Sequence, residues 1–248
     1  MHLLNNAAHR PWPVPSNNWI MRQKWRNSLF MHWPVKPELV RNLIPSPLRL
    51  DTFQGYAWLG YIAFLMDGIY PRALPKLPLT RSFPEINVRT YVQYDGKPGI
   101  FFLSIDVKNW ASLKIARHWY RLPYHASNVS IEHKGTTFSF QSIRNENNRH
   151  ISFKALYKPI SDVFSPEEGT LDHWLTERYC LYSRDKTSNI YCGEIHHLPW
   201  PLQKAEFEVQ SNSLLSPFNI NLRNTNPIAH YSGGVDALIW NIRKVHSR

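Results

Sequence analysis

The stretch "NVRTYVQYDGKPGIFFLSIDV", from Asn87 to Val107, carries the clearest fold signal in the chain. Two runs of β-branched and aromatic residues flank the pair Asp95-Gly96. An Asp-Gly pair between such runs favours the tight turn that joins two antiparallel strands, because both turn positions require positive φ. The sequence therefore predicts a β-hairpin here.

The first strand of this hairpin also suggests a site. Side chains alternate along a strand, so Asn87, Arg89 and Tyr91 share one face, and the intervening apolar residues and Thr90 share the other. If the first face points outward, these are ordinary solvated side chains. If the strands close into a barrel, the same face lines a pocket in which Arg89 suits a carboxylate.

The rest of the chain predicts a mainly β (α+β) protein, an antiparallel β-barrel with two or three flanking helices, because hairpin signals dominate and no βαβ alternation occurs. An extended lead-in covers residues 10–19, and a Pro-rich loop covers residues 71–84. Besides the hairpin, strands are expected within residues 48–68, 128–132, 136–143, 150–157, 178–197 and 205–211. Helices are expected over residues 35–45, with Leu39, Val40, Leu43 and Ile44 on one face, over residues 109–120, and from Thr170 to about Glu177.

Length and charge limit the function classes. The 248 residues suit a single β-rich domain, expected to span residues 1–248. Lysine and arginine exceed aspartate and glutamate by 29 − 18 = 11. These cations are scattered, with no run of five and no nucleic-acid-binding motif, so nucleic acid is not expected as a partner. A homo-oligomer is compatible with the sequence, which does not set the number of subunits.

The compartment expected from the sequence is the cytoplasm. The longest apolar runs fall short of the roughly 20 residues of a membrane-spanning helix, so no membrane partner is expected. The N-terminus lacks the pattern of a secretory signal. Cys180 and Cys192 have no CxxC spacing, and in the cytoplasm they are expected to be reduced thiols.

Two further groups of polar residues are candidates for a functional site. His32, His196 and His197 have no carboxylate at ligand spacing, and adjacent histidines on a strand point to opposite faces, so neither a metal nor another cofactor is expected. The stretch "ARHWYRLPYHAS", Ala116 to Ser127, allows three interpretations: a basic aromatic patch, a core strand with polar residues at its margins, or an altered copy of a catalytic loop.

Longer motifs resemble a known family. "RPWP", "HWPV", "LDTFQGYAWLG", "FPEINVRTYV", "LPYHAS", "HHLPWPLQKAE" and "HYSGGVDALIW" spread from Arg10 to Trp240 and together resemble the uncharacterised YqjF-like family (DUF2071). That family in turn resembles the acetoacetate decarboxylase-like superfamily. The resemblance implies a β-barrel or cone with flanking helices and a cavity for a small ligand.

In the decarboxylases, a Gly-Arg-Glu segment leads to a proline followed by two lysines, and the first lysine forms a Schiff base with a keto acid. The resemblance aligns Arg117 with that arginine and Pro123 with that proline, so the two lysines become Tyr124 and His125. A Schiff base requires a primary amine, which neither residue supplies. Lys114 lies some ten positions upstream and would have to reach back into the cavity.

The resemblance further implies a polar pocket. Glu85 or Asn87 falls near the position where the decarboxylases carry an acidic residue in their cavity. Arg89 and Arg117 are candidates to bind a substrate carboxylate. Tyr124 and His125 are the catalytic candidates. We expect Arg89 and Tyr124 to line one cavity, where a buried guanidinium needs a partner, Glu85 first and a bound anion second. Two functions stay open: an enzyme acting on a small carbonyl or carboxylate compound without a Schiff base, or a non-catalytic module that binds an aromatic or acyl ligand.

Overall fold

The fold is built almost entirely from β-strands. The computed structural model describes residues 3–72, 82–108, 120–222 and 225–245. Its strands are β1 (Met21–Val35), β2 (Arg49–Leu50), β3 (Ala57–Pro71), β4 (Phe83–Tyr94), β5 (Lys97–Val107), β6 (Tyr124–Ala126), β7 (Asn128–Lys134), β8 (Thr137–Glu146), β9 (Arg149–Pro159), β10 (Cys180–Arg184), β11 (Ile190–His197), β12 (Leu202–Asn212), β13 (Ile228–Ile239) and β14 (Arg243–Lys244). The helical segments are α1 (Pro37–Arg41), α3 (Leu171–Thr176) and the 3₁₀ turn η2 (Ser216–Phe218).

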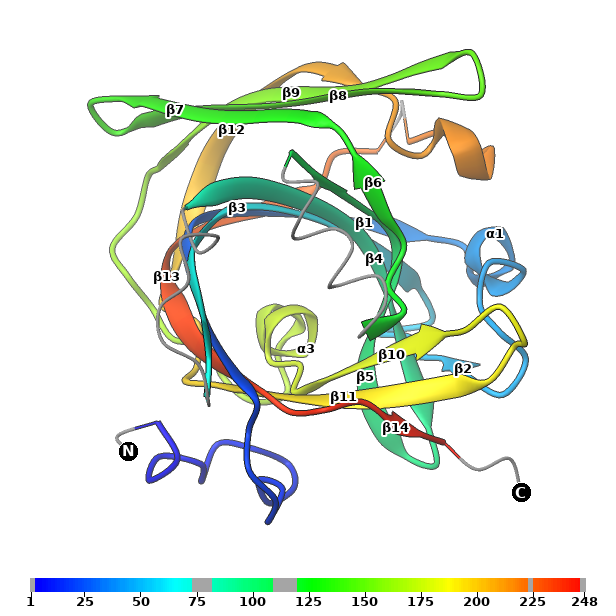
Figure 1. The fold of residues 1–248 in the computed structure, drawn as a ribbon. Coiled ribbons are helices and arrows are strands. Elements are labelled where there is room, and N and C mark those ends of the chain that lie inside the picture. The colour runs from blue at the N-terminus through cyan, green and yellow to red at the C-terminus, as the bar shows by residue number, and fades with distance from the viewer. Residues whose placement is uncertain (1–2, 73–81, 109–119, 223–224, 246–248) are drawn as a thin grey trace.

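Seven strands close into a ring in the order β11-β10-β5-β4-β3-β1-β13, and pairing of β13 with β11 completes it (Figure 1). Most neighbours are antiparallel, whereas β5 pairs in parallel with both β10 and β6. The expected mainly β, closed architecture is confirmed, with these two parallel pairings as an addition. The predicted hairpin is β4–β5, whose turn residues Asp95 and Gly96 have φ of 51° and 75°.

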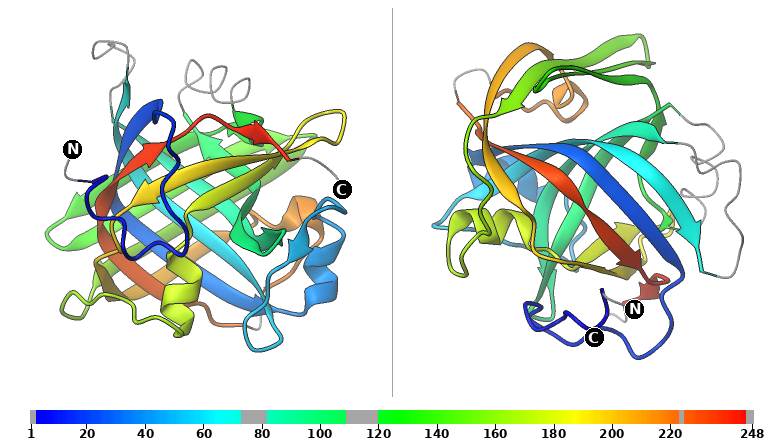
Figure 2. Two further views of the ribbon diagram at one scale, coloured as in Figure 1. Left: turned by 90° about the horizontal axis from the view of Figure 1, so that it is seen from below. Right: turned by 90° about the vertical axis from the view of Figure 1, so that its left-hand side faces the viewer.

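A second layer covers one side of the ring. Strand β12 pairs with β13 through its first residues and with β9 through the remainder, so the sheet continues into β9, β8 and β7 (Figures 1 and 2). The main core lies between the layers, where Phe140 and Phe153 of the outer sheet share a cluster with Leu59, Ile86 and Val88 of the ring. This packing buries the outer face of β3 and β4.

The helices flank the ring. Thr170 accepts a hydrogen bond from the backbone N–H of His173, as the expected N-cap of α3. Figures 1 and 2 show α3 at one end of the ring. Helix α1 is shorter than expected, and the four apolar residues expected on one face differ in exposure: Val40 and Ile44 are buried, whereas Leu39 is 52% exposed. The helix expected over residues 109–120 lies outside the described residues except for Tyr120.

Candidate functional site

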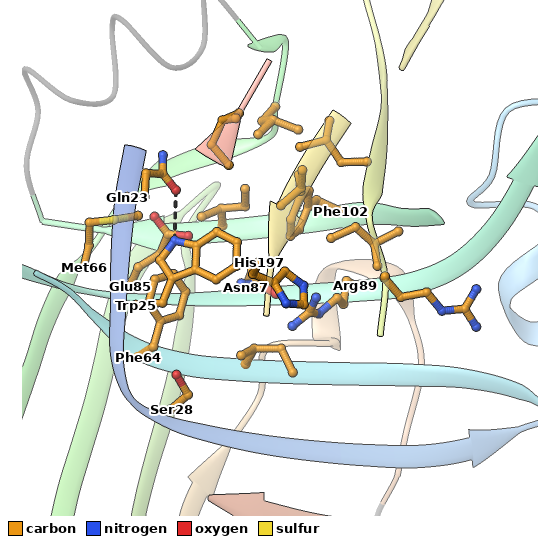
Figure 3. Close-up of a pocket in the computed structure, with 18 of the residues that line it drawn as sticks. Gln23, Trp25, Ser28, Phe64, Met66, Glu85, Asn87, Arg89, Phe102 and His197 are labelled. Carbon is orange, nitrogen blue, oxygen red and sulfur yellow. Dashed lines mark hydrogen bonds between the residues drawn. The ribbon is translucent and has the colours of Figure 1, made fainter. Parts of the chain in front are cut away.

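The ring encloses a small cavity of about 100 Å³. Most of its wall is apolar, including Trp25, Phe64, Phe102 and Trp200. Figure 3 shows the labelled side chains gathered around this space, with the indole N–H of Trp25 donating to Gln23 Oε1 at 2.9 Å. The polar groups of the wall come mainly from β4, from β6 and from the residues that follow α3.

Strand β4 supplies three polar side chains to the cavity. Glu85, Asn87 and Arg89 alternate with Ile86 and Val88, which pack in the core on the other face. The face predicted from the sequence is therefore the inner face of the ring. Its polar residues are enclosed because the apolar residues between them face the outer sheet.

Bulges adjust which residues of the neighbouring strands face inward. The pairing of β4 with β5 shifts between Val88 and Arg89, so Ile105 and Phe102 both line the cavity although they are three residues apart. The pairing of β1 with β3 shifts in the same way near Asn27, which has φ of 51°. A bulge adds one residue to one strand and so reverses its alternation.

Glu85 is held in an environment that favours its neutral form. Its side chain is buried, and burial raises the pKa of its carboxyl to about 8, because desolvation penalises the charged form. The positive charge of Arg89 opposes this shift but does not cancel it. At neutral pH Glu85 is therefore mainly protonated and is able to donate a hydrogen bond.

Arg89 is the central cation of the cavity. Burial lowers the pKa of its guanidinium, and the nearby charge of Arg178 acts in the same direction. Among the described residues, Arg89 forms no ion pair within 4.0 Å, and its Nε has no hydrogen-bond partner. The expected direct pairing with Glu85 is thus not formed, although the two groups interact electrostatically.

Arg178 lines the same cavity and was not predicted from the sequence. It donates to Asp51 Oδ2 and to the carbonyl oxygen of Trp174, both at 2.6 Å, and its guanidinium lies 4.9 Å from the ring centre of Tyr91. These contacts leave its Nη2 without a partner. No sequence signal marks it, because its role depends on α3 closing the end of the ring.

Several cavity residues carry buried polar atoms that make no hydrogen bond within the described structure. They are Ser28 Oγ, Asn87 Oδ1, Arg89 Nε, Tyr120 Oη and Arg178 Nη2. A buried polar atom left unsatisfied costs about 1–3 kcal/mol. These five atoms give the largely apolar wall several hydrogen-bonding groups without partners among the described residues.

The two catalytic candidates point in opposite directions. Strand β6 pairs with β5 so that Tyr124 lies beside Ile105 and His125 beside Asp106. Tyr124 lines the cavity, and burial raises the pKa of its phenol, so the hydroxyl keeps its proton. His125 does not line it; its Nδ1 lies 3.3 Å from Glu146 Oε1, outside the ring.

The predicted site residues thus divide into three groups. Glu85, Asn87, Arg89 and Tyr124 share one cavity, as expected for Arg89 and Tyr124. His125 is separated from them because neighbouring residues on a strand face opposite sides. Arg117, like Lys114, lies outside the described residues.

The histidines considered as metal ligands have other partners. His32 Nε2 lies 2.7 Å from the hydroxyl of Tyr91, and His196 Nε2 lies 2.8 Å from the carbonyl oxygen of Leu3. Burial lowers the pKa of His32 and of His197, which keeps both imidazoles neutral. Across the part of the chain that the structure describes, no group of three or more His, Cys, Asp or Glu side chains is arranged to hold a metal ion.

No helix within the described ranges has the length and apolar character required to span a membrane.

The sequence matches a known protein family. Residues 22–236 match DUF2071, a family described as an uncharacterised conserved protein. The chain belongs to the DUF2071 family. It is 42% identical over 231 residues to the uncharacterised protein YqjF of Bacillus subtilis, covering 93% of this chain and 95% of that protein.

Solved structures share the fold at low sequence identity. Acetoacetate decarboxylase from Legionella pneumophila has a TM-score of 0.60 at 13% identity, over 98% of this chain and 95% of that one. The enduracididine biosynthesis enzyme MppR, in complex with pyruvate, has a TM-score of 0.64 at 11% identity, over 94% and 93% of the two chains. The DUF2071 chain therefore has the acetoacetate decarboxylase-like fold.

Proposed function

We propose that this DUF2071 protein binds a small monocarboxylate in the ring cavity, with the carboxylate at Arg89, and exchanges a proton with it through Glu85. The observation that carries the proposal is the guanidinium of Arg89, which faces the cavity without an ion pair among the described residues. Arg89 is largely but not fully buried, and an uncompensated charge held away from water is unfavourable. A bound carboxylate supplies the missing partner.

The charge of the cavity favours one negative charge on the ligand. Arg178 is paired with Asp51 at 2.6 Å, and Glu85, with a pKa of about 8, is mainly neutral at pH 7. Among the described residues that line the cavity, Arg89 is then the remaining uncompensated charge. The unpartnered Nη2 of Arg178 is left to donate a second hydrogen bond to the same carboxylate.

The size of the cavity favours a short ligand. Its volume of about 100 Å³ is below the roughly 300–1,000 Å³ of pockets that hold drug-sized compounds. Trp25, Phe64 and Trp200 provide an apolar wall for the ligand's carbon atoms. MppR, which shares the fold, was solved with pyruvate, a monocarboxylate of this size.

The chemistry assigned to the site is proton transfer without a Schiff base. Among the described residues that line the cavity there is no lysine. Glu85 has a pKa near working pH, the condition under which a carboxyl both donates and accepts protons efficiently. The protonated hydroxyl of Tyr124 is a second donor for a ligand carbonyl or the enolate formed from it.

A second candidate function is binding without turnover. It is favoured by the position of His125, which was the expected acid or base and lies outside the cavity beside Glu146. The two functions share the ligand and differ only in whether Glu85 moves a proton.

Calorimetry with pyruvate and with its neutral amide tests the binding step. We expect pyruvate to bind and the amide, which has the same shape without the charge, to bind at least tenfold more weakly. Arg89→Met should abolish the difference, while the matched surface variant Arg184→Met should retain it. Equal binding of pyruvate and its amide would contradict the proposal.

Proton transfer is tested separately by exchange of the methyl protons of pyruvate in D₂O, followed by NMR. Exchange catalysed by the native protein and lost in Glu85→Gln supports enolisation. Binding without catalysed exchange would support the second candidate.

A further inference from the structure

The two cysteines share one face of the sheet, outside the ring. On the paired strands β10 and β11, Cys180 lies opposite Glu194 and Tyr182 lies opposite Cys192. Residues opposite one another, and those two positions along, point to the same side. Leu181 and Ile195, which alternate with them, line the cavity, so both thiols face away from the proposed ligand site.

This face is rich in positive charge. The carboxylate of Glu194 contacts Lys97, Arg10 Nη2 at 3.1 Å and Arg243 Nη2 at 3.9 Å. Three cations around one carboxylate leave a surplus of two positive charges. Arg243 is also the direct cross-strand neighbour of Cys192 on the short edge strand β14.

The two thiols differ in environment. Cys180 is fully buried, and its Sγ lies 3.3 Å from the carbonyl oxygen of Pro98. Cys192 is partly exposed. A hydrogen bond from Cys180 is the largest cause that lowers the pKa of the Cys192 thiol; the charges of Lys97 and Arg243 act in the same direction, whereas burial and the carboxylate of Glu194 oppose them. Burial raises the pKa of the Cys180 thiol. Because Cys180 has one proton, it bonds either to Pro98 or to Cys192, and a thiolate at Cys192 favours the second.

We propose that Cys192 is a reactive thiol of this protein and forms a mixed disulfide with small disulfides that carry negative charge. The thiolate sulfur of Cys192 attacks one sulfur of the disulfide RSSR. The bond Cys192–S–SR forms as the RS–SR bond breaks, and RS⁻ leaves with the electron pair. No further oxidant is required, because the small disulfide is itself reduced.

The charge pattern explains the preference for an anionic reagent. A thiolate is the attacking species, and reactive cysteines occur in partly exposed, electropositive surroundings. Lys97 and Arg243 stabilise the thiolate and also attract carboxylates on the incoming disulfide. The charge of Lys97 also acts on Cys180, but that thiol is buried, and burial raises its pKa.

The reaction of the folded protein with 5,5′-dithiobis(2-nitrobenzoate), a disulfide with two carboxylates, tests the proposal. We expect one fast equivalent of thionitrobenzoate from the native chain, loss of that phase in Cys192→Ser, and its retention in Cys180→Ser. Peptide mass spectrometry should place the adduct on Cys192. A fast phase that survives Cys192→Ser, or release only after denaturation, would overturn the proposal.

Charge variants test the recognition of the anion. Lys97→Gln combined with Arg243→Gln should lower the rate at which Cys192 reacts with the anionic disulfide roughly threefold or more. The rate of reaction with neutral 2,2′-dithiodipyridine should fall less. Lys186→Gln with Arg184→Gln, on the neighbouring β10–β11 turn, is the matched control. Equal slowing of both reagents would refute the role of these cations. Thermal denaturation of each variant establishes that the fold is retained.

Discussion

Glu85 and Arg89 face the same cavity from one strand, four residues apart, yet make no ion pair within 4.0 Å of each other. Successive residues of a strand are separated by about 3.3 Å, so their Cα atoms lie about 13 Å apart. The two side chains therefore lie toward opposite ends of the cavity. The gap between them is where we place the ligand.

Arg89→Met should abolish carboxylate binding without lowering stability. The guanidinium has no ion pair among the described residues, so replacing it with an apolar side chain removes a desolvation cost. We expect pyruvate to raise the melting temperature of the native chain but not that of the variant. A loss of several kcal/mol in the free energy of unfolding of Arg89→Met would instead assign Arg89 a structural role.

Glu85→Gln should stabilise the protein increasingly as pH rises. The pKa of the carboxyl is raised from its ordinary value of 4.5 to about 8 in the folded state. Between these two pH values the folded protein therefore holds a proton that the unfolded chain releases. Its contribution to stability is present below pH 4.5 and is lost as pH rises through 8. The stability difference between variant and native chain should grow by up to about 1.4 kcal/mol per pH unit in that window. Urea denaturation at pH 5 and pH 8 measures it, and a difference independent of pH would contradict the shifted pKa.

Pyruvate affinity should fall above pH 8, because ionised Glu85 adds a negative charge to the cavity. If the ligand binds only the protein with protonated Glu85, affinity decreases about tenfold per pH unit beyond that point. Calorimetric titrations from pH 6 to pH 10 test this, and Glu85→Gln should flatten the profile.

Tyr124→Phe should impair the site, whereas His125→Gln should leave it nearly unchanged. Tyr124 lines the cavity, so loss of its hydroxyl should weaken pyruvate binding or proton exchange several-fold. His125 faces Glu146 on the outside, where an ion pair contributes about 1 kcal/mol or less. Binding that depends on His125 but not on Tyr124 would reverse this assignment.

Borohydride reduction in the presence of acetoacetate should leave the protein unmodified. The two residues directly after Pro123 are Tyr124 and His125, and the cavity wall contains no lysine among the described residues. A Schiff base requires a primary amine. Intact-mass measurement detects an adduct, and one mapped to Lys114 would restore a decarboxylase-type mechanism.

Gly234→Ala should be severely destabilising, because Gly234 has φ of +123° and a Cβ there would lie 1.9 Å from the carbonyl oxygen of Trp25. That clash would separate β1 from β13, two neighbouring strands of the ring, so we expect a loss of about 3 kcal/mol or more in the free energy of unfolding. Gly96→Ala is the control: its φ is +75°, but nothing lies within 4 Å, and the cost should be about 1 kcal/mol. Equal effects of the two variants would count against a tightly packed β1–β13 seam.

The sequence predicted those parts of the fold whose signals are local. Regular alternation and an Asp-Gly turn defined the hairpin of β4 and β5, and Thr170 marked the start of α3. Two strands of the ring, β1 and β13, were not predicted. The alternation of β1 is broken near Asn27, where its pairing with β3 shifts, and Gly234 of β13 has positive φ; the two strands also pair with each other although they lie far apart in the sequence.

By itself, the sequence determined that Asn87, Arg89 and Tyr91 share one face, since that follows from the two-residue period of a strand. Only the tertiary structure decided that this face is the interior, because closure depends on the distant pairing of β11 with β13. The same long-range contacts brought Arg178 into the cavity beside Arg89, and the pairing of β6 with β5 turned Tyr124 inward and His125 outward. Alternation orders side chains relative to one another, whereas burial depends on which other surface covers each face.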